Sequence, residues 1–120
     1  MAPTTMGKLA AEFLISEANN NRSRDEVTVD ATAAALEPGT ILGKVTASGD
    51  FVRHAAGASD GSENEAGILM FGIGAVEEER TIVARDAEVS QADLTYEAGA
   101  DAAQITASNA ALAALGIIVR

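Results

Sequence analysis

The residue best suited to acid–base or metal chemistry is His54, the sole histidine of the chain, which borders a polar, glycine-rich loop. A general base acts on a nucleophile or an acid positioned beside it, and no motif around His54 supplies one. Zinc sites of the usual kind combine several histidine or cysteine ligands, and this chain has no cysteine. We therefore expect His54 to be an ordinary surface-loop residue, and we expect no catalytic residue and no metal ligand in the chain.

Oxygen-bearing side chains gather in the loop at residues 60–65, which reads Asp-Gly-Ser-Glu-Asn-Glu. Such a set could bind calcium, but its spacing is not that of an EF-hand loop, so a solvated turn is the favoured interpretation. The segment at 72–74 lacks the third glycine of a dinucleotide-binding fingerprint, and the acidic triplet at 77–79 would repel a pyrophosphate. These observations predict no bound cofactor.

The charge of the chain excludes further classes of partner. Its net charge of −10 argues against binding to nucleic acid and to anionic membranes, because phosphate recognition needs a basic surface. The charge is also uneven, since residues 1–24 carry a net +1 and residues 25–120 a net −11. An acidic body with a weakly basic end suits a protein that contacts an acidic or neutral partner through that end, although acidity can also simply reflect solubility.

The size and composition of the chain fit one domain with a thin core. Its 120 residues suffice for a single core. Of the apolar residues of the chain, 26 are alanines and 31 are larger, so the apolar fraction of 48% overstates the core. Three Phe, one Tyr and no Trp are too few for an aromatic platform that stacks nucleic-acid bases. We see neither the roughly 20 apolar residues that span a bilayer nor a signal-peptide pattern.

The elements that must position these residues are mostly short strands. Apolar patterns predict strands at 25–30, 40–46, 51–53, 67–72, 80–85 and 117–119, with 86–89 continuing beyond a bend. Residues 48–50 predict a hairpin turn, the run 67–72 a strand buried on both faces, and the glutamates at 77–79 an exposed turn. A capping box of Asp101 and Gln104 predicts a helix that ends near Leu115, before Gly116. The pattern indicates a mainly β (α+β) domain with one C-terminal helix.

An apolar triplet near the N-terminus, Phe13-Leu14-Ile15, stands apart from these strands. The polar segment at 19–24 separates it from the first predicted strand, so we expect the triplet to have little to pack against within its own subunit. We interpret residues 1–24 as a flexible arm that another chain completes, and residues 25–120 as the folded domain. The alternative is that the triplet is the first core strand of the domain.

Seven segments, in the expected order, resemble the head decoration proteins of tailed bacteriophages, the family of lambda protein D. They are residues 12–18, 22–29, 38–45, 59–63, 66–69, 85–89 and 113–120. The resemblance therefore covers the chain from about residue 11 to residue 120.

The resemblance implies a bent β-ribbon, or β-clip, in a small barrel with a helix and an extended N-terminal arm. It also implies a homotrimer without catalytic activity in the virion, on the outer surface of the expanded capsid. There it would sit at three-fold positions and staple neighbouring major capsid proteins, because in that family the N-terminal segment adds to a strand of the capsid. The contact residues carried over to this chain are Phe13, Leu14, Ile15, Ser16 and Glu17.

A different class of function is a small β-barrel carrier or ligand-binding domain of a bacterial enzyme. Residues 40–52 loosely resemble the hairpins of biotinyl and lipoyl carrier domains, which hold their modified lysine at the hairpin tip. Lys44 falls inside the predicted strand instead. A hydrolase is a third class, and the single histidine and the missing nucleophile motif argue against it.

Overall fold

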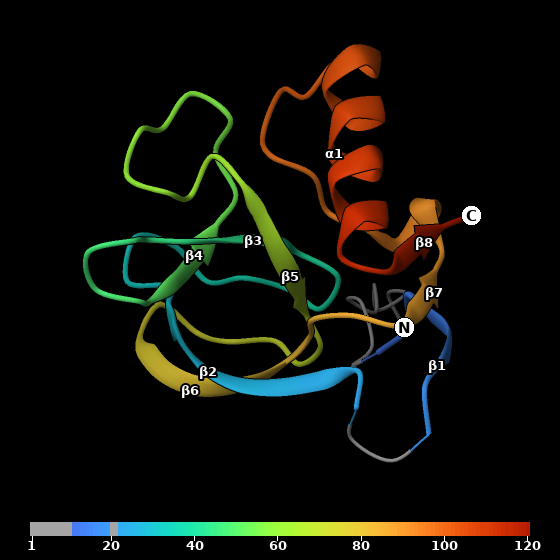
Figure 1. The fold of residues 1–120 in the computed structure, drawn as a ribbon. Helices are drawn as coiled ribbons and strands as arrows, with labels where there is room; N and C mark the ends of the chain where they lie inside the picture. Colours follow the sequence, from blue (N-terminus) through green and yellow to red (C-terminus); the bar gives the residue numbers. More distant parts are fainter. Residues whose placement is uncertain (1–10, 20–21) are drawn as a thin grey trace, which may run out of the picture.

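Two β-sheets and one α-helix make up the fold (Figure 1), which a computed structural model describes for residues 11–19 and 22–120. This architecture confirms the predicted mainly β fold with a small barrel and one C-terminal helix. The β-clip arrangement stays a prediction, and residues 1–10, 20 and 21 of the predicted arm lie outside the described residues. The strands are β1 (Leu14–Glu17), β2 (Arg24–Asp30), β3 (Ile41–Lys44), β4 (Phe51–Arg53), β5 (Glu65–Leu69), β6 (Glu77–Val83), β7 (Ala87–Val89) and β8 (Ile117–Val119), and the helical elements are η1 (Gln91–Asp93) and α1 (Ala102–Ala114).

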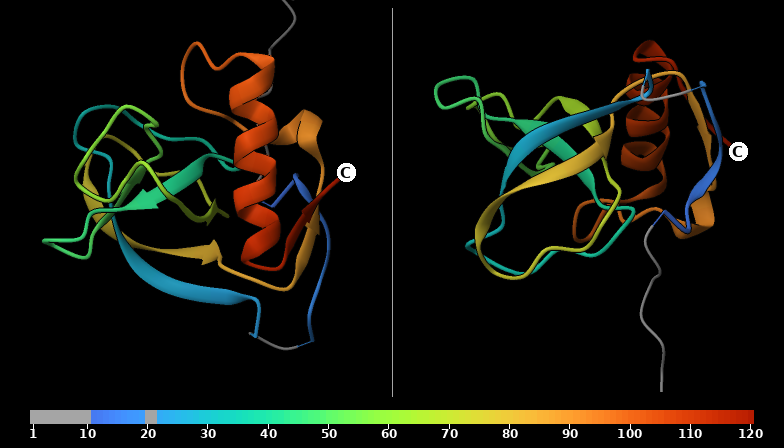
Figure 2. Two further views of the ribbon diagram at one scale, coloured as in Figure 1. Left: turned by 45° about the horizontal axis from the view of Figure 1, so that its top comes forward. Right: turned by 90° about the horizontal axis from the view of Figure 1, so that it is seen from below.

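Five strands close into a barrel in the order β2-β4-β3-β5-β6. The hairpin of β3 and β4 turns at Gly49, whose φ of 78° is readily adopted by glycine and whose N–H donates to Val45 O at 2.8 Å. The predicted turn at 48–50 is therefore confirmed. β2 and β6 pair antiparallel along their full length, from Arg24 opposite Val83 to Asp30 opposite Glu77, and this ribbon curves around the barrel (Figure 2).

The glutamates at 77–79 lie in a strand, so the prediction of an exposed turn is wrong. They are the first residues of β6, their side chains are exposed, and their backbone is paired with the second half of β2. A run of like charges has no strand periodicity of its own. The ladder that makes it a strand comes from β2, which is distant in the sequence, so no local pattern indicates it.

The second sheet has the order β1-β7-β8, with β1 antiparallel and β8 parallel to β7. α1 lies beside β8 and begins at the predicted capping box, in which Asp101 accepts a hydrogen bond from Gln104 N at 2.8 Å. The helix ends before Gly116, whose φ of 89° fits the predicted position just beyond a helix C-terminus. Within residues 11–19 and 22–120, no helix has the length and apolar character of a bilayer-spanning segment.

Two apolar cores divide the interior, and β5 contributes to both. Ile68 belongs to the core that the second sheet and α1 share with the barrel, and its neighbour Leu69 belongs to the core inside the barrel. This alternation confirms a strand buried on both faces, although β5 ends at Leu69 and Phe71 is 43% exposed. The sheet core consists of Phe13, Ile41, Ile68, Met70, Val83, Ala87, Val89, Leu94, Leu112 and Ile117, and the barrel core of Val29, Ala31, Leu36, Leu42, Phe51, Leu69, Ile73, Ile82 and Ala84.

Candidate functional site

The predicted capsid-contact residues form β1 and the residue before it. Phe13 is only 1% exposed and belongs to the sheet core, and Leu14 is half-buried against the same core. The expectation that the apolar triplet has little to pack against in its own subunit is therefore wrong for Phe13 and Leu14. The other buried members of this core lie at residue 41 and beyond, so they leave no signal near residue 13.

Ile15 differs from its neighbours because β1 is irregular at that position. Leu14 pairs with Val89 and Ser16 pairs with Glu88, so β1 uses three residues where β7 uses two. Such a β-bulge leaves one residue without a partner and re-aims its side chain. Ile15 is 55% exposed, the highest value among the large apolar side chains of the described residues.

Hydrogen bonds hold the outer face of the sheet together across its strands. Ser16 Oγ donates to Glu88 Oε1 at 3.0 Å, and Arg120 Nε donates to Glu88 Oε2 at 2.6 Å. The guanidinium of Arg120, and after it the Ser16 hydroxyl, lower the pKa of Glu88 below its usual range. β1, β7 and the C-terminal residue are therefore joined through one carboxylate, which stays charged at neutral pH.

Glu17, the last residue of β1, is hydrogen-bonded to residues at the start of β2. Its carboxylate accepts hydrogen bonds from the guanidinium of Arg24, with Arg24 Nε at 3.0 Å from Oε1, and from the Ser23 hydroxyl. The Arg24 hydrogen bond lowers the pKa of Glu17, with a smaller lowering from Ser23. The sheet and the barrel are thus connected by an ion pair beside their covalent link.

β1 is the edge strand of its sheet. It pairs with β7 on one side, and no described strand pairs with its other side. Backbone N–H and C=O groups along such an edge are the groups with which a strand from another chain pairs. The side chain presented at this edge is the exposed Ile15.

A second exposed isoleucine lies on the same face. Ile118 of β8 is in register with Glu88, which is opposite Ser16, and the Ile118 side chain is 41% exposed. Ile117, the residue before it in the predicted strand at 117–119, is fully buried in the sheet core. The period of two in a strand with one covered face could have indicated this. We call Ile15, Ser16, Glu88, Ile118 and Arg120 the edge patch; the sequence predicted only the first two as contact residues.

The family of the chain is decided by comparison with known families. The family model of the bacteriophage lambda head decoration protein D matches residues 3–117. The chain belongs to this family. The resemblance found in the sequence is confirmed, and the protein is a capsid-associated structural component of the virion that decorates the phage head. The family is one of structural proteins and not of enzymes. No curated protein matches the chain.

His54 of this decoration protein is buried, which corrects the prediction of a surface-loop residue. Its side chain is 5% exposed, and Nε2 lies 2.9 Å from both Glu65 Oε1 and Glu63 O. Two acceptors at one ring nitrogen require that this nitrogen carries the proton. The Glu65 side chain is also buried. The pair therefore links the first residue after β4 to the first residue of β5, at the two ends of the loop between these strands. No motif in the sequence indicates this pair, because Glu65 contacts His54 only once the intervening loop has folded.

In the loop at residues 60–65, carboxylate oxygen atoms accept hydrogen bonds from groups of the same loop. Asp60 Oδ1 accepts hydrogen bonds from Ser62 Oγ at 2.6 Å and from Ser62 N at 3.0 Å, and Glu63 Oε2 accepts from Gly61 N at 2.8 Å. The Ser62 hydroxyl, followed by its backbone N–H, lowers the pKa of Asp60. These carboxylates shape the turns of the decoration protein's own loop.

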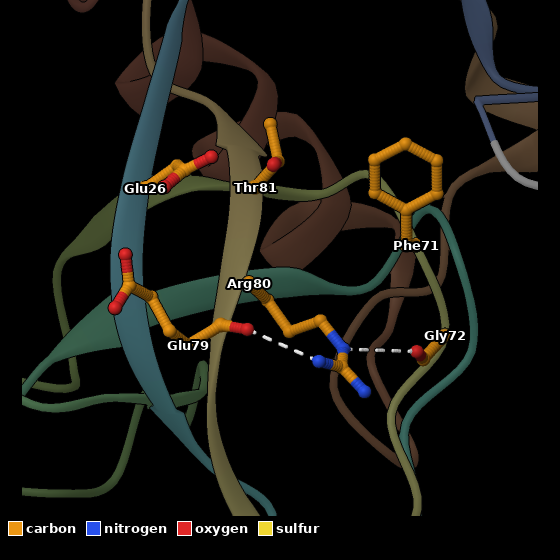
Figure 3. Close-up of a pocket in the computed structure, with 6 residues that line it drawn as sticks. All are labelled: Glu26, Phe71, Gly72, Glu79, Arg80 and Thr81. Atoms are coloured by element: carbon orange, nitrogen blue, oxygen red, sulfur yellow. Dashed lines mark hydrogen bonds between the residues drawn. The ribbon is translucent and has the colours of Figure 1, made fainter.

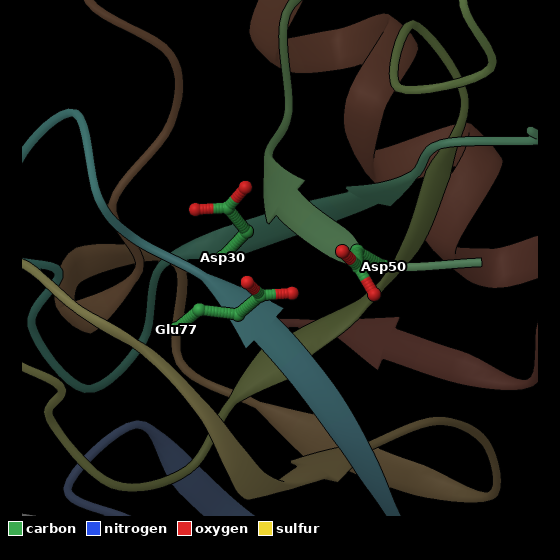
Figure 4. A group of neighbouring side chains, drawn as sticks. All are labelled: Asp30, Asp50 and Glu77. Atoms are coloured by element: carbon green, nitrogen blue, oxygen red, sulfur yellow. The ribbon is translucent and has the colours of Figure 1, made fainter. Parts of the chain in front are cut away.

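A carboxylate cluster that the sequence did not indicate lies at the other end of the β2–β6 ladder. Asp30, Asp50 and Glu77 come from three neighbouring strand ends, and their oxygen atoms lie within 4.8 Å of one another (Figure 4). Hydrogen bonding and like charge from Asp50, with a smaller contribution from Asp30, raise the pKa of Glu77. Three such groups could hold a cation, but exposed acidic groups are common on protein surfaces without one. We call these residues the acidic cluster.

Lys44 does not occupy the place of a carrier lysine. It is the last residue of β3, and its Nζ lies 5.9 Å from the centroid of the Phe51 ring on β4. The tip of the hairpin is at Gly49. The position of Lys44 therefore gives no support to the carrier alternative.

Proposed function

We propose that this decoration protein binds as a homotrimer at three-fold positions on the outer surface of the expanded phage head. Each subunit would staple neighbouring major capsid proteins through β1, with residues 25–120 forming the trimer and residues 1–24 supplying the capsid contact. Membership of the head decoration family supports the capsid partner. The observation that carries the mode of attachment is the outer edge of β1, with which no strand of the described residues pairs.

The five contact residues take different parts in this proposal. Phe13 and Leu14 anchor the strand in the sheet core, and the hydrogen bonds of Ser16 and Glu17 fix its course. Ile15 is the side chain that meets the capsid protein, because the bulge turns it outward. A strand added along β1 would extend the sheet beyond β7 and β8 and bury Ile15.

A strand that is already held in place binds at a lower entropic cost than a free arm. Ordering one flexible residue costs roughly 1–2 kcal/mol, and β7 has already ordered β1. Burying the exposed part of Ile15 contributes up to roughly 1.5–3 kcal/mol, in addition to the backbone hydrogen bonds. Arg120 also neutralises Glu88 beside the edge, so Glu88 would already be paired when this face is covered.

Trimerisation would turn one modest contact into firm attachment. A single strand addition with one apolar side chain is weak, whereas three on one rigid body act together. After the first contact, each later one is intramolecular and benefits from a high effective concentration. Oligomeric state is therefore part of the proposed mechanism and must be measured together with capsid binding.

The test is Ile15→Asp, which puts a charge on the side chain that the capsid would cover. Each subunit should lose roughly tenfold or more in affinity, since a buried unpaired carboxylate is added to the lost apolar contact. The trimer and its melting temperature should change little because Ile15 is exposed. Co-sedimentation with expanded heads measures attachment, and analytical ultracentrifugation measures the oligomer.

The matched control is Val76→Asp, the same type of change at a side chain that is 43% exposed. Val76 lies next to the acidic cluster, at the end of the β2–β6 ladder away from β1, and should not affect attachment. Unchanged binding of the Ile15→Asp protein would rule out β1 as the contact. A monomeric wild-type protein in solution and on heads would rule out the trimer.

A further inference from the structure

Two hollows of the molecule differ in how their polar side chains are satisfied. The larger, of about 410 Å³, crosses the outer side of the β2–β6 ribbon, and Figure 3 shows the residues that line it. None of these residues is buried, and the Arg80 guanidinium already donates to Gly72 O at 3.3 Å and to Glu79 O at 3.1 Å. This groove therefore presents no buried polar group that lacks a partner.

The smaller hollow is a cavity of about 180 Å³ beside α1. The loop after β4, the start of β5, the segment at 96–100 and one side of α1 line it. Since one water molecule takes up about 30 Å³ in the liquid, the cavity has room for a molecule of several non-hydrogen atoms. We call it the helix cavity.

One buried hydroxyl at the helix cavity lacks a partner. Ser108 is 6% exposed and lines the cavity from α1. A hydroxyl within a helix often donates to the carbonyl one turn earlier, as Thr106 does to Ala102 O at 2.9 Å. The Ser108 hydroxyl makes no such bond and has no other partner among the described residues. Because every fully enclosed side-chain N or O atom of the described residues has a partner, this hydroxyl opens to the cavity.

Carboxylates give the helix cavity a negative lining. Glu63, Glu65 and Glu97 line it, and His54 is the basic group among its lining residues. Glu65 is paired with His54, whereas Glu63 and Glu97 make no ion pair with a basic side chain of the described residues. The Glu97 carboxylate is held in place by a neutral donor, Ala56 N, at 2.7 Å. A positively charged occupant is therefore favoured.

The spacing of these groups favours an organic cation over a metal ion. Protein ligands lie about 2.0–2.6 Å from a bound metal ion, so their donor atoms are also close to one another. Among the described residues, the acidic cluster alone brings three or more such groups within 4.8 Å of one another, so the carboxylates and imidazole of the helix cavity do not converge in this way. Ala100, Ala107 and Ala111 also line the cavity, and their methyl side chains suit contact with an alkyl chain.

We propose that the helix cavity binds a primary alkylammonium group, with the alkyl chain against the alanines and the ammonium toward Glu97 and Ser108. An ammonium donates three hydrogen bonds, and a carboxylate and a hydroxyl both accept them. Such a group belongs either to a small free amine or to a lysine side chain of a partner protein. The cavity shares no residue with the edge patch, so the site does not depend on the proposed mode of capsid attachment.

Titration of the intact protein with n-butylammonium chloride at constant ionic strength, followed by NMR, tests the site. The backbone N–H signals of Ala56, Gln104 and Ser108 should shift along one saturable curve. We expect a Kd of about 1 mM, since a ligand of five non-hydrogen atoms supports only a modest affinity. n-Butanol has the same alkyl chain without the charge and should bind roughly fivefold or more weakly, because hydrogen bonds to charged groups are the stronger ones.

Two substitutions remove the acceptors one at a time. Glu97→Gln removes the charge but keeps an oxygen for Ala56 N, and it should weaken binding roughly tenfold. Ser108→Ala removes the hydroxyl and should weaken binding roughly threefold, while alanine is well tolerated in a helix. Circular dichroism and melting temperatures show whether each variant is folded. The matched control is Glu79→Gln outside the cavity, which should leave the Kd unchanged.

A saturating concentration of n-butylammonium distinguishes the two sources of the ammonium group. If a lysine of another copy or of the capsid protein occupies the cavity, the amine should dissociate the oligomer or release the protein from expanded heads, a readout that rests on the proposed function. Unchanged oligomer and attachment would assign the site to a free amine. The absence of saturable shifts, or equal affinity for n-butanol, would overturn the proposal. A Kd that is the same in the wild-type, Glu97→Gln and Ser108→Ala proteins would also overturn it.

Discussion

The two ends of the β2–β6 ladder differ in whether their carboxylates are paired with basic side chains. At the Arg24 end, next to β1, the carboxylate of Glu17 is paired with that arginine, and the neighbouring Glu88 is paired with Arg120. At the Asp30 end, the acidic cluster brings three carboxylates together, and no basic side chain of the described residues is paired with them. Covering unpaired like charges is much costlier than covering neutralised ones. The end beside β1 is therefore suited to burial under a partner, and the other end to solvent.

The pKa values of Glu17 and Glu77, one at each end of the ladder, are shifted in opposite directions. The Arg24 hydrogen bond lowers the pKa of Glu17, so the folded protein favours its charged form. The proximity of Asp50 raises the pKa of Glu77, so the folded protein disfavours its charged form. Acidification should therefore weaken the fold at one end of the ladder and relieve repulsion at the other. Three substitutions test the packing beside β1 and this difference in charge between the two ends.

The largest effect is expected from Phe13→Ala, which removes the aromatic ring of the sheet core beside β1. Truncating a buried phenylalanine costs about 3–5 kcal/mol of unfolding free energy, because it leaves a cavity as well as removing apolar contacts. Urea denaturation followed by circular dichroism measures this loss. Phe71→Ala, the same change at a partly exposed ring, should cost much less. Equal losses for the two variants would mean that Phe13 is not part of the core.

A smaller effect is expected from Glu17→Gln, which weakens the link between β1 and β2. The lowered pKa of Glu17 means that its stabilising contribution is present above the ordinary pKa of 4.5 and is lost as the pH falls through its folded value. The variant should lose about 1 kcal/mol of unfolding free energy at pH 7. At a pH well below the pKa of Glu17 in the folded protein, the wild-type and Glu17→Gln proteins should be equally stable. A difference that persists undiminished in acid would show that the ion pair is not its cause.

The smallest effect, with the opposite sign, is expected from Glu77→Gln in the acidic cluster. Its raised pKa means that the folded protein binds the proton more tightly than the unfolded chain does, so charging Glu77 destabilises the fold as the pH rises. The variant should melt at a slightly higher temperature at pH 7 and at the wild-type temperature below pH 4. Glu79→Gln on the same strand, outside the cluster, is the control. A lower melting temperature of Glu77→Gln at pH 7 would contradict the repulsion.

Features with a local cause could be predicted from the sequence. The capping box of Asp101 and Gln104 forms because its two partners are one helical turn apart, and the turn at Gly49 forms because glycine tolerates positive φ. The burial of Ile68 and Leu69 on opposite faces of β5 follows from the apolar run at 67–72. The family could be recognised because its segments are distributed along the chain in order.

Features that depend on a distant partner could not be predicted. Phe13 is buried in a core whose other members lie between Ile41 and Ile117, and His54 is paired with Glu65 across a loop. The glutamates at 77–79 are a strand because β2 pairs with them, not because their side chains prefer one. The acidic cluster likewise exists only where three strand ends converge. Within the edge patch, the sequence predicts Ile15 and Ser16 as contacts, whereas the nearness of Ile118 to Ser16 depends on the pairing of β8 with β7 and of β7 with β1.

The most direct test of the account is the structure of expanded heads decorated with this protein, determined by electron cryomicroscopy. The account predicts trimeric density at three-fold positions, with a strand of the major capsid protein paired along the outer edge of β1 and Ile15 buried beneath it. An attached protein whose β1 edge faces solvent, with the capsid contact elsewhere, would contradict the account.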